Sequence, residues 1–320
     1  MKKALITGMY GQDGSYVAEL LKAKGYEIRG IVHAPMSENS VRIRQELRDK
    51  GIVIETTDIP LTDYALLKEE IEAFRPDEIY HLAATHFSAE KADLVTESSL
   101  FVNNITATSN ILDICYNYHK DARIVTAGSC LMYDATHTDE QSEKTPFASN
   151  TYYGIAKITE NMLVRMFRDR GLYACTAILY NHESHRRAET FVTRKIVKNM
   201  VRIARGEQES FTLGSLDAMK DWGFAGDYAR AMHLMLDQSV PKDYVLATGS
   251  LHSIGEFVEE CAQQLQIPDW HRCVQVNDRI LARKNSATLK GDSSLAAREL
   301  GWKRTKGFAE IIAEMISEEK

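Results

Sequence analysis

Tyr153 and Lys157, one helical turn apart, form the pair of side chains in this sequence with the clearest capacity for chemistry. On a helix this spacing places both side chains on one face. An ammonium group held near a phenol favours the phenolate and so lowers the pKa of the phenol. The pair therefore predicts a general base that takes a proton from a sugar or alcohol hydroxyl near neutral pH.

A serine hydroxyl belongs with this pair. Ser129 follows the apolar run 123–128, which is typical of a buried parallel strand. A hydroxyl at the carboxyl end of such a strand points into the crevice where α/β sheets bind ligands. Taken alone, Tyr153 and Lys157 would more often be a chance pair on a solvated helix. With the rest of the chain in view, we expect Ser129, Tyr153 and Lys157 to form one catalytic site.

A glycine-rich loop, Gly8-Met-Tyr-Gly-Gln-Asp-Gly14, directly follows the first apolar strand and opens a helical pattern. Glycines at such a turn let the backbone approach a pyrophosphate, which lies on the helix N-terminus. The loop therefore predicts a dinucleotide site rather than a plain turn. The residues expected to contact the cofactor are Gly8, Tyr10, Gly11, Gln12, Asp13, Gly14, Asp58, Leu82, Tyr153 and Lys157.

The end of the second strand predicts which nicotinamide cofactor binds. An acidic residue there binds the ribose 2′-hydroxyl of NAD, whereas an arginine accepts the 2′-phosphate of NADP. The strand ends in His33 and Ala34, which are neither, and Arg42 and Arg44 come later on a helical pattern. We therefore expect NAD and keep NADP open. Asp58 has two equally supported roles, as an acceptor at the adenine edge and as the cap of the following turn.

Apolar runs typical of strands alternate with helical patterns through the first half of the chain. The alternation predicts right-handed βαβ units and hence an α/β fold, a Rossmann-type doubly wound parallel sheet. We expect residues 1–180 to form an NAD(P)-binding domain. Residues 181–320 should form a smaller C-terminal substrate-binding lobe, with some segments returning to the first domain. The strands are expected at 4–7, 28–32, 52–55, 78–83, 124–127 and 174–179.

Composition and charge exclude several classes of function. The chain has 320 residues and a net charge of −6, which gives no electrostatic footprint for nucleic acid or an anionic membrane. It has no apolar run long enough to span a bilayer and no signal peptide. The five cysteines are scattered without metal-type spacing. They predict reduced thiols, no metal site and a cytoplasmic location.

Together these motifs resemble the extended short-chain dehydrogenase/reductases, and more closely the GDP-mannose 4,6-dehydratase family. The resemblance covers nearly the whole chain. Its most specific parts are the segments Tyr180-Asn-His-Glu-Ser184 and Phe191-Val-Thr-Arg-Lys-Ile196, which separate this family from other sugar-nucleotide enzymes. Further matches are the segments 7–16, 153–157, 186–187, 213–218, 221–223 and 247–249.

The resemblance implies an NAD(P)-dependent enzyme that acts on a GDP-linked sugar bound in the C-terminal lobe. On the family pattern Asn181 and Glu183 contact the sugar or the diphosphate, and Lys195 and Arg283 meet guanine or phosphate. Lys220 stands where the family usually has arginine, so it keeps the charge without a bidentate fork. Such cations would give this acidic protein the local charge that a diphosphate needs. The substrate-binding residues implied are Asn181, Glu183, Arg187, Lys195, Lys220 and Arg283.

The family also carries two arginines at the end of the second strand, which serve the NADP phosphate and a tetramer contact. This chain has His33 and Ala34 there instead. The departure favours NAD over NADP. By analogy with the family it favours a homodimer formed through a helical interface, with a tetramer as the other arrangement.

One departure bears on the reaction itself. The family oxidises its sugar at C4, removes water across C5 and C6, and returns the hydride to C6. The removal of water needs a glutamate two residues after the hydroxyl residue. Leu131 stands at that position, and an aliphatic side chain cannot move a proton. Losing a positioned acid/base costs about 10²–10⁴-fold in rate.

Three functions follow from these residues. We favour hydride transfer at C4 without elimination, by a 4-dehydrogenase, a 4-ketoreductase or a 4-epimerase. The alternative is a 4,6-dehydratase in which Cys130 or His86 replaces the glutamate. The third is a catalytically silent dinucleotide-binding protein, and the presence of Ser129, Tyr153 and Lys157 counts against it.

Overall fold

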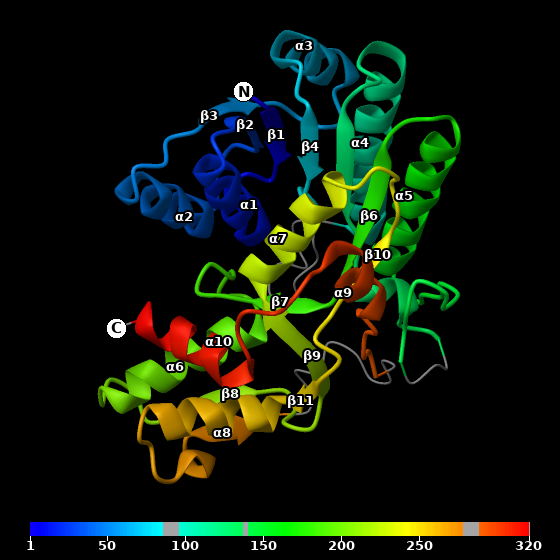
Figure 1. Cartoon of the computed structure of the whole chain (residues 1–320). Coiled ribbons are helices and arrows are strands. Elements are labelled where there is room, and N and C mark those ends of the chain that lie inside the picture. The colour runs from blue at the N-terminus through cyan, green and yellow to red at the C-terminus, as the bar shows by residue number, and fades with distance from the viewer. Residues whose placement is uncertain (86–95, 137–139, 278–287, 320) are drawn as a thin grey trace.

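A seven-stranded parallel sheet forms the centre of the larger part of the molecule (Figure 1). The computed structural model describes residues 1–85, 96–136, 140–277 and 288–319. The strand order is β10-β6-β5-β4-β1-β2-β3, which confirms the predicted doubly wound sheet. The strands are β1 (Lys3–Thr7), β2 (Glu27–Val32), β3 (Glu55–Asp58), β4 (Glu78–His81), β5 (Arg123–Ala127), β6 (Ala174–Leu179) and β10 (Tyr244–Leu246).

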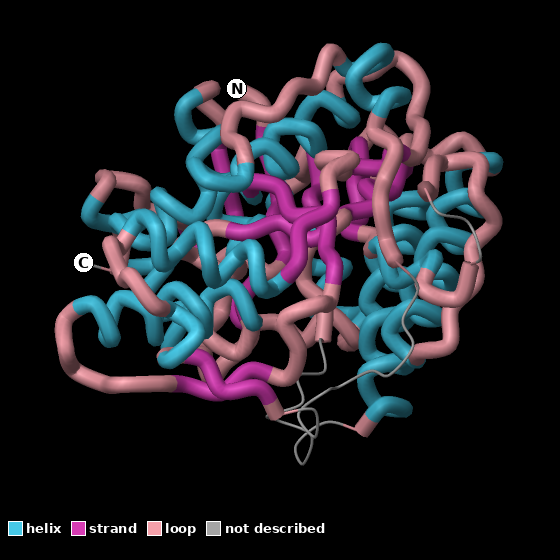
Figure 2. The backbone as a smooth tube through the Cα atoms, turned by 90° about the horizontal axis from the view of Figure 1, so that it is seen from below, coloured by secondary structure: helices cyan, strands magenta, loops and turns pink. Residues whose placement is uncertain are grey.

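Helices cover both faces of this sheet, which is why its inner strands are rich in apolar residues. Figure 2 shows the strands in the middle of the molecule with helices on either side. The chain switches from one side of β1 to the other when it enters β4, and ligands of open α/β sheets bind at such a point. One layer holds α1 (Gln12–Ala23), α2 (Glu38–Asp49) and α7 (Ala225–Leu236), and the other holds α3 (Tyr64–Phe74), α4 (Glu97–Tyr118) and α5 (Tyr152–Asp169).

Segments from the second half of the chain complete the sheet. β10 pairs in parallel with β6, and α9 (Ser294–Leu300) packs beside α7 and β10. The apolar side chains of α9 join the same core as those of α1 and α7. The chain therefore crosses between its two parts several times, and both parts meet along the carboxyl edge of the sheet.

The smaller lobe lies below the sheet in Figure 1 and has its own apolar core. It begins with β7, which follows β6 after one residue, so the lobe starts at the carboxyl edge of the sheet. Helices α6, α8 and α10 pack against one another in this lobe. Its elements are β7 (Asn181–Glu183), β8 (Phe211–Leu213), β9 (Met219–Phe224), β11 (Leu251–Ser253), β12 (Val274–Val276), α6 (Val192–Ala204), α8 (Ile254–Gln264) and α10 (Phe308–Ser317).

The third strand is displaced from its predicted position. The sequence predicted it at 52–55, but β3 is the polar segment Glu55–Asp58. Among the described residues this strand pairs only with β2, at the edge of the sheet, where its side chains are not required to be apolar. Ile52 and Ile54 pack against the core from the loop before the strand. The apolar run therefore marks the approach to the strand and not the strand itself.

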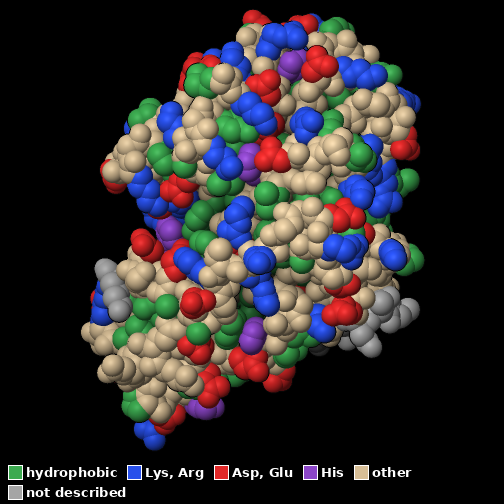
Figure 3. All heavy atoms as spheres, viewed as in Figure 1, with side chains coloured by type: hydrophobic (Ala, Val, Ile, Leu, Met, Phe, Trp, Pro, Cys, Tyr) green, Lys and Arg blue, Asp and Glu red, His purple; other side chains and the backbone are tan. Residues whose placement is uncertain are grey.

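The surface of the molecule carries charges of both signs, as the composition of the sequence leads one to expect. Among the described residues, no helix is long and apolar enough to cross a bilayer. On the face in Figure 3, positive and negative side chains are interspersed over both parts of the molecule. All five cysteines are buried and unpaired.

Candidate functional site

A cavity of about 460 Å³ opens at the carboxyl edge of the sheet, between the ends of β1, β2 and β4. The glycine-rich loop forms one wall through Gly8, Tyr10 and Gly11, and Leu82 lies on another. These four are among the residues predicted to contact a cofactor. The other six predicted residues do not line the cavity: Gln12, Asp13, Gly14, Asp58, Tyr153 and Lys157.

The backbone of the loop can approach a phosphate only because glycines form it. Gly8 has a φ of +69°, and a Cβ built on it would lie 2.9 Å from the amide nitrogen of Ala83. A Cβ at Gly14 would lie 2.4 Å from the carbonyl oxygen of Gly8. α1 begins at Gln12, within this glycine-rich segment, and its N-cap residue, Gly11, has no side chain that could bind the first amides. The residues present therefore fit a dinucleotide pyrophosphate at this helix N-terminus.

Gln12 and Asp13 join the loop to the lobe. The side-chain amide of Gln12 donates to the carbonyl oxygen of His182 at 3.0 Å, and Ser184 Oγ donates to Gln12 Oε1 at 2.9 Å. His182 Nε2 lies 2.9 Å from Asp13 Oδ1. Burial alone would raise the pKa of Asp13, but the charge and hydrogen bond of His182, the charge of Arg187 and the hydrogen bond from Gln12 together outweigh it, and the pKa is lowered. These side chains therefore set the position of β7 over the glycine loop.

Asp58 contacts the end of the second strand. Its Oδ1 accepts the backbone N–H of Ala34 at 3.0 Å, and the residue is exposed. The carboxylate thus caps the turn after β2 and leaves negative charge next to His33. Of the two roles predicted for Asp58, this contact fits the role of a cap. The prediction placed the cap on the turn that follows Asp58, whereas the structure places it on the turn after β2.

The structure brings Ser129, Tyr153 and Lys157 to one place. Ser129 caps the short 3₁₀-helix η2 (Cys130–Tyr133), where its Oγ accepts the Leu131 N–H at 3.2 Å. Thr151 caps α5, which carries both other residues, and Lys157 Nζ lies 5.8 Å from the centre of the Tyr153 ring. Lys157 is almost fully buried, at 3% exposure. The end of β5 and the start of α5 therefore bring the three predicted catalytic residues to one corner of the crevice, called the catalytic corner below.

Gly154 allows α5 to pack this closely. A Cβ built on it would lie 2.4 Å from the carbonyl oxygen of Leu131, a backbone atom that cannot move without shifting η2. It would also lie 2.0 Å from Ser149 Oγ. The glycine next to Tyr153 therefore sets the distance between the tyrosine and the segment that holds Ser129.

We expect Gly154→Ala to destabilise the protein by about 1–3 kcal/mol, because the added methyl group overpacks this contact. Chemical denaturation measures the loss. Gly255, near the start of α8, is the matched control, since its nearest neighbour to a built Cβ is 3.4 Å away. Gly255→Ala should change stability by less than about 1 kcal/mol. Wild-type stability in Gly154→Ala would contradict the close packing described here.

The pKa of Tyr153 departs from the sequence prediction. Desolvation in the crevice raises it above the ordinary value for a phenol, whereas Lys157 and Arg187 lower it. Glu160 and Cys130 raise it further. The prediction had the right sign for the effect of Lys157 but omitted burial, so a net lowering is wrong for the protein without ligands.

Leu131 lies in an apolar cluster. It packs beside Met132 and Tyr133, which are fully buried. Burial raises the pKa of the neighbouring Cys130 thiol to about 11, although Lys220 opposes the rise. A thiol with that pKa is a poor acid/base near neutral pH. Cys130 is therefore an unsuitable replacement for a glutamate, and His86, the other candidate, lies outside the described residues.

β7 carries Asn181 and Glu183 on one side of the strand and His182 on the other. Glu183 is 2% exposed, and its Oε2 accepts the Thr193 hydroxyl at 2.6 Å. Arg187 Nε lies 3.5 Å from the same oxygen. The Glu183 carboxylate is thus held inside the lobe, where it orients Arg187.

Two of the predicted cations act on the catalytic corner. Desolvation has the largest effect on Tyr153 and on Cys130, but Arg187 lowers the pKa of the phenol and Lys220 that of the thiol. Lys195 is partly exposed on α6. Arg283 lies outside the described residues. The described cations therefore reach the corner from two directions, from the loop after β7 and from β9.

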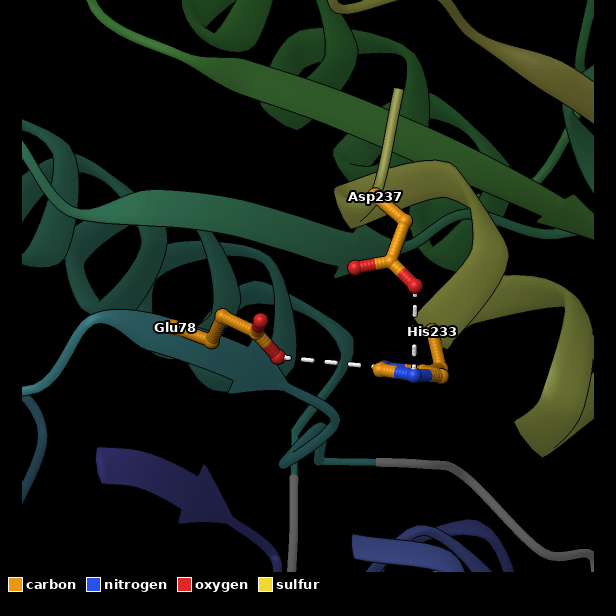
Figure 4. Close-up of side chains that lie close together, drawn as sticks. All are labelled: Glu78, His233 and Asp237. Carbon is orange, nitrogen blue, oxygen red and sulfur yellow. Dashed lines mark ion pairs between the residues drawn. The ribbon is translucent and has the colours of Figure 1, made fainter. Parts of the chain in front are cut away.

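A separate cluster of ionisable groups lies at the opposite, amino-terminal edge of the sheet. Figure 4 shows His233 between Glu78 and Asp237, with nitrogen–oxygen distances of 3.9 Å and 3.4 Å. Glu78 already accepts hydrogen bonds from Lys2 at 2.9 Å and from Tyr80 at 2.8 Å. Because these groups satisfy one another, the cluster offers no argument for a bound metal ion.

Three curated proteins are similar to the chain over almost its whole length. A GDP-mannose 4,6 dehydratase of Arabidopsis thaliana is 37% identical over 327 residues, which is 99% of this chain and 87% of the relative. The human protein of that name is 37% identical, over 98% of this chain and 90% of its own length. A Vibrio cholerae relative is 34% identical, over 99% and 94%. A sequence model of the family described as GDP-mannose 4,6 dehydratase matches residues 5–315.

Solved structures show the same fold at lower sequence identity. The Thermotoga maritima UDP-glucose 4-epimerase with UDP-glucose superposes with a TM-score of 0.84 and is 18% identical, covering 98% of this chain and 97% of the other. A dTDP-glucose 4,6-dehydratase from Bacillus anthracis in complex with NAD has a TM-score of 0.83 and 17% identity, with 99% and 96% covered.

Proposed function

Because the chain belongs to the GDP-mannose 4,6-dehydratase family, we propose that it is an NAD-dependent enzyme that transfers hydride at C4 of a GDP-linked sugar. It would act as a 4-dehydrogenase, a 4-ketoreductase or a 4-epimerase and would not remove water across C5 and C6. One observation carries this proposal. Leu131 occupies an apolar cluster beside Ser129 and α5, where elimination would need a side chain that moves protons.

The catalytic corner supports proton transfer at C4. Tyr153 would take the proton of the C4 hydroxyl, and the Ser129 hydroxyl would hold the same oxygen. Desolvation raises the pKa of Tyr153, and the charge of Lys157 opposes this rise. The cofactor held by the glycine-rich loop would supply the hydride acceptor and, when oxidised, a further positive charge. A catalytic base with a raised pKa in the free protein would thus be activated when the site is filled.

The end of the second strand supports NAD. The Asp58 carboxylate lies beside this turn, where a 2′-phosphate would meet negative charge. Arg42, one of the two arginines that were candidates for a 2′-phosphate, donates to Asn39 and to the carbonyl oxygen of His185. The bacterial dTDP-glucose 4,6-dehydratase of similar fold was also solved with NAD. The GDP-sugar is proposed from the names of the relatives and from the cations Arg187 and Lys220 near Tyr153 and Cys130.

The products of a panel of GDP-sugars test the proposal. The protein would be incubated with GDP-mannose and related GDP-sugars, with NAD and separately with NADP, and the products separated and weighed by mass spectrometry. We expect loss or gain of two hydrogens, or an isomer of unchanged mass, with NAD preferred. A product lighter by one water would refute the proposal and favour the 4,6-dehydratase. Tight binding without any conversion would favour the silent binding protein.

We also infer that the chain forms a homodimer through α4 and α5. Apolar side chains are exposed along one face of α5 at helical spacing, with Ile155 at 42% and Met162 at 63% exposure, and Val102 of α4 adds to them at 54%. α4 and α5 pack against each other, so these side chains form a joint apolar surface. A second copy of the same surface would cover it by two-fold symmetry.

Met162→Glu should weaken this dimer at least about tenfold, because it places a charge in an apolar interface. Size-exclusion chromatography with light scattering at several concentrations measures the mass. Val53→Glu is the control, since Val53 is 67% exposed but lies before β3, away from α4 and α5. A wild-type monomer, or dimers that both substitutions leave equally intact, would rule out this interface.

A further inference from the structure

A chain of buried hydrogen bonds connects the glycine-rich loop to the catalytic lysine. Thr7 Oγ1 lies 2.8 Å from His81 Nδ1, and His81 Nε2 lies 3.1 Å from Thr108 Oγ1. Thr108 Oγ1 lies 3.1 Å from Glu160 Oε2, and Lys157 Nζ lies 3.0 Å from the same oxygen. The chain passes from β1 through β4 and α4 to α5 and uses one side chain or two from each. Sequence reasoning singled out Lys157 but none of its partners.

The direction of every bond in this chain is fixed. The Thr7 oxygen accepts the backbone N–H groups of Leu82 and Ala83, both at 3.1 Å, so its own proton is donated to His81 Nδ1. His81 therefore carries its proton on Nε2 and donates it to Thr108. The Thr108 hydroxyl in turn donates to Glu160. The Thr108 and Lys157 donors thus both point toward Oε2 of Glu160, and this arrangement favours the ionised carboxylate.

Burial isolates the chain from solvent. Thr7 and Thr108 are fully buried, and His81, Lys157 and Glu160 are each 3% exposed. Burial and the charge of Lys157 lower the pKa of His81 to about 3, so the imidazole stays neutral. Burial also opposes the charge on Lys157, but Glu160 and Tyr153 outweigh it and the pKa of the lysine is raised. Burial raises the pKa of Glu160, although Lys157 and Thr108 oppose the rise. Lys157 and Glu160 form an ion pair with 3.0 Å between nitrogen and oxygen, which salt screens little.

We propose that Glu160 is a positioning residue for hydride transfer. As the fixed negative end of this chain of hydrogen bonds, it holds Lys157 protonated next to Tyr153 and partly offsets the positive charge that acts on the tyrosine. The proposal rests on the proposed function, since Tyr153 is the base of that reaction. The i, i+3 spacing on α5 places Glu160 against Lys157, and the chain from Thr7 fixes its carboxylate. The strength of the base would thus be set by a group that touches neither substrate nor cofactor.

The pH dependence of the reaction gives the proposal a signature. The groups that face Lys157 are Tyr153 and Glu160 on its own helix and His81 from the sheet. The groups that face Tyr153 also include Cys130 and Arg187, and a substitution of residue 160 leaves both of these groups in the protein. Removing the charge of Glu160 lowers the pKa of Tyr153 and also that of Lys157. Since the reaction needs Tyr153 deprotonated and Lys157 protonated, both limbs of the pH–rate profile should move to lower pH.

Glu160→Gln tests this with little change of shape. The amide oxygen of the glutamine can accept from Thr108 and Lys157, and its NH₂ takes the place of Oε1, which has no hydrogen-bond partner among the described residues. We expect both limbs of the profile of kcat/KM to shift downward by about one pH unit, with KM nearly unchanged. Asp169→Asn, which removes an exposed carboxylate from the end of the same helix, should leave the profile at its wild-type position. A uniform fall in rate without a shift would overturn the proposal.

A second measurement does not depend on any sugar. Nitrogen-15 NMR of the histidine rings should find His81 neutral, protonated on Nε2 and not titrating between about pH 6 and 9. Its signal is identified by its absence from His81→Asn. If the protein transfers hydride but His81 titrates in this range, or carries its proton on Nδ1, the role proposed for Glu160 is wrong and the proposed function stands. The expected tautomer in a protein that turns over no GDP-sugar would overturn the proposed function, and the role of Glu160 with it.

Discussion

Tyr153→Phe is expected to lower the rate of cofactor reduction with a GDP-sugar by about 10²–10⁴-fold, because it removes the hydroxyl that takes the C4 proton. The substitution keeps the ring, which packs near Lys157 Nζ. The same loss is expected for every reaction that begins with hydride transfer at C4. The prediction therefore tests the base whatever the final product is.

The neighbouring residue provides the control for this change. Tyr152 precedes Tyr153 on α5 and is 48% exposed. Tyr152→Phe removes the same hydroxyl group from the same turn of helix and should keep at least about half of the wild-type rate. Absorbance of the reduced nicotinamide follows both variants, and calorimetry should show that each binds NAD as the wild type does. Full activity in Tyr153→Phe would refute the assignment of the base.

The sequence predicted the architecture because two simple periodicities determine it. Buried parallel strands give continuous apolar runs, and amphipathic helices lie between them, so the doubly wound sheet can be predicted without knowledge of contacts. The prediction failed at β3, where an edge strand is polar and the apolar residues Ile52 and Ile54 lie before it. Edge strands lack the burial from which the pattern arises.

The site was less predictable because tertiary contacts determine which polar residues meet. Glu160 lies three residues after Lys157, a spacing that is as common on exposed helix faces as in buried pairs. Nothing in the sequence distinguishes the two cases, since the burial comes from α4 and the sheet. The raised pKa of Tyr153 has the same origin: the sequence supplied the charge of Lys157 but not the desolvation that outweighs it.

Two adjacent arginines show the same limit. Arg186 is fully buried and donates to Glu19 at 2.7 Å and to Glu46 at 2.5 Å, so it ties the lobe to α1 and α2. Arg187 turns the other way, toward Glu183 and the catalytic corner. Both belong to the segments that match the family. Only the path of the chain after β7 separates the arginine that holds the two parts together from the one that acts on the site.

Leu131→Glu is expected to create a dehydrating enzyme, with formation of a product lighter by one water rising about 10²-fold or more above the wild-type level. Residue 131 lies two positions after Ser129, and its carbonyl oxygen lies against the start of α5. A carboxyl group there could remove the C5 proton of the 4-keto sugar and protonate the departing C6 hydroxyl. The apolar surroundings would raise the pKa of the new carboxyl group, which suits a residue that both takes and gives a proton.

The comparison that decides this prediction is with Leu131→Gln. Glutamine has the size and polarity of glutamate but cannot transfer a proton, so a gain from mere opening of the apolar cluster would appear in both variants. Mass spectrometry of products from GDP-mannose, in parallel with the wild type, should find dehydration only with glutamate. If neither variant dehydrates, a missing acid/base is not the barrier to elimination. If the wild type already does, another group performs that step, and the assignment of the reaction to C4 alone is wrong.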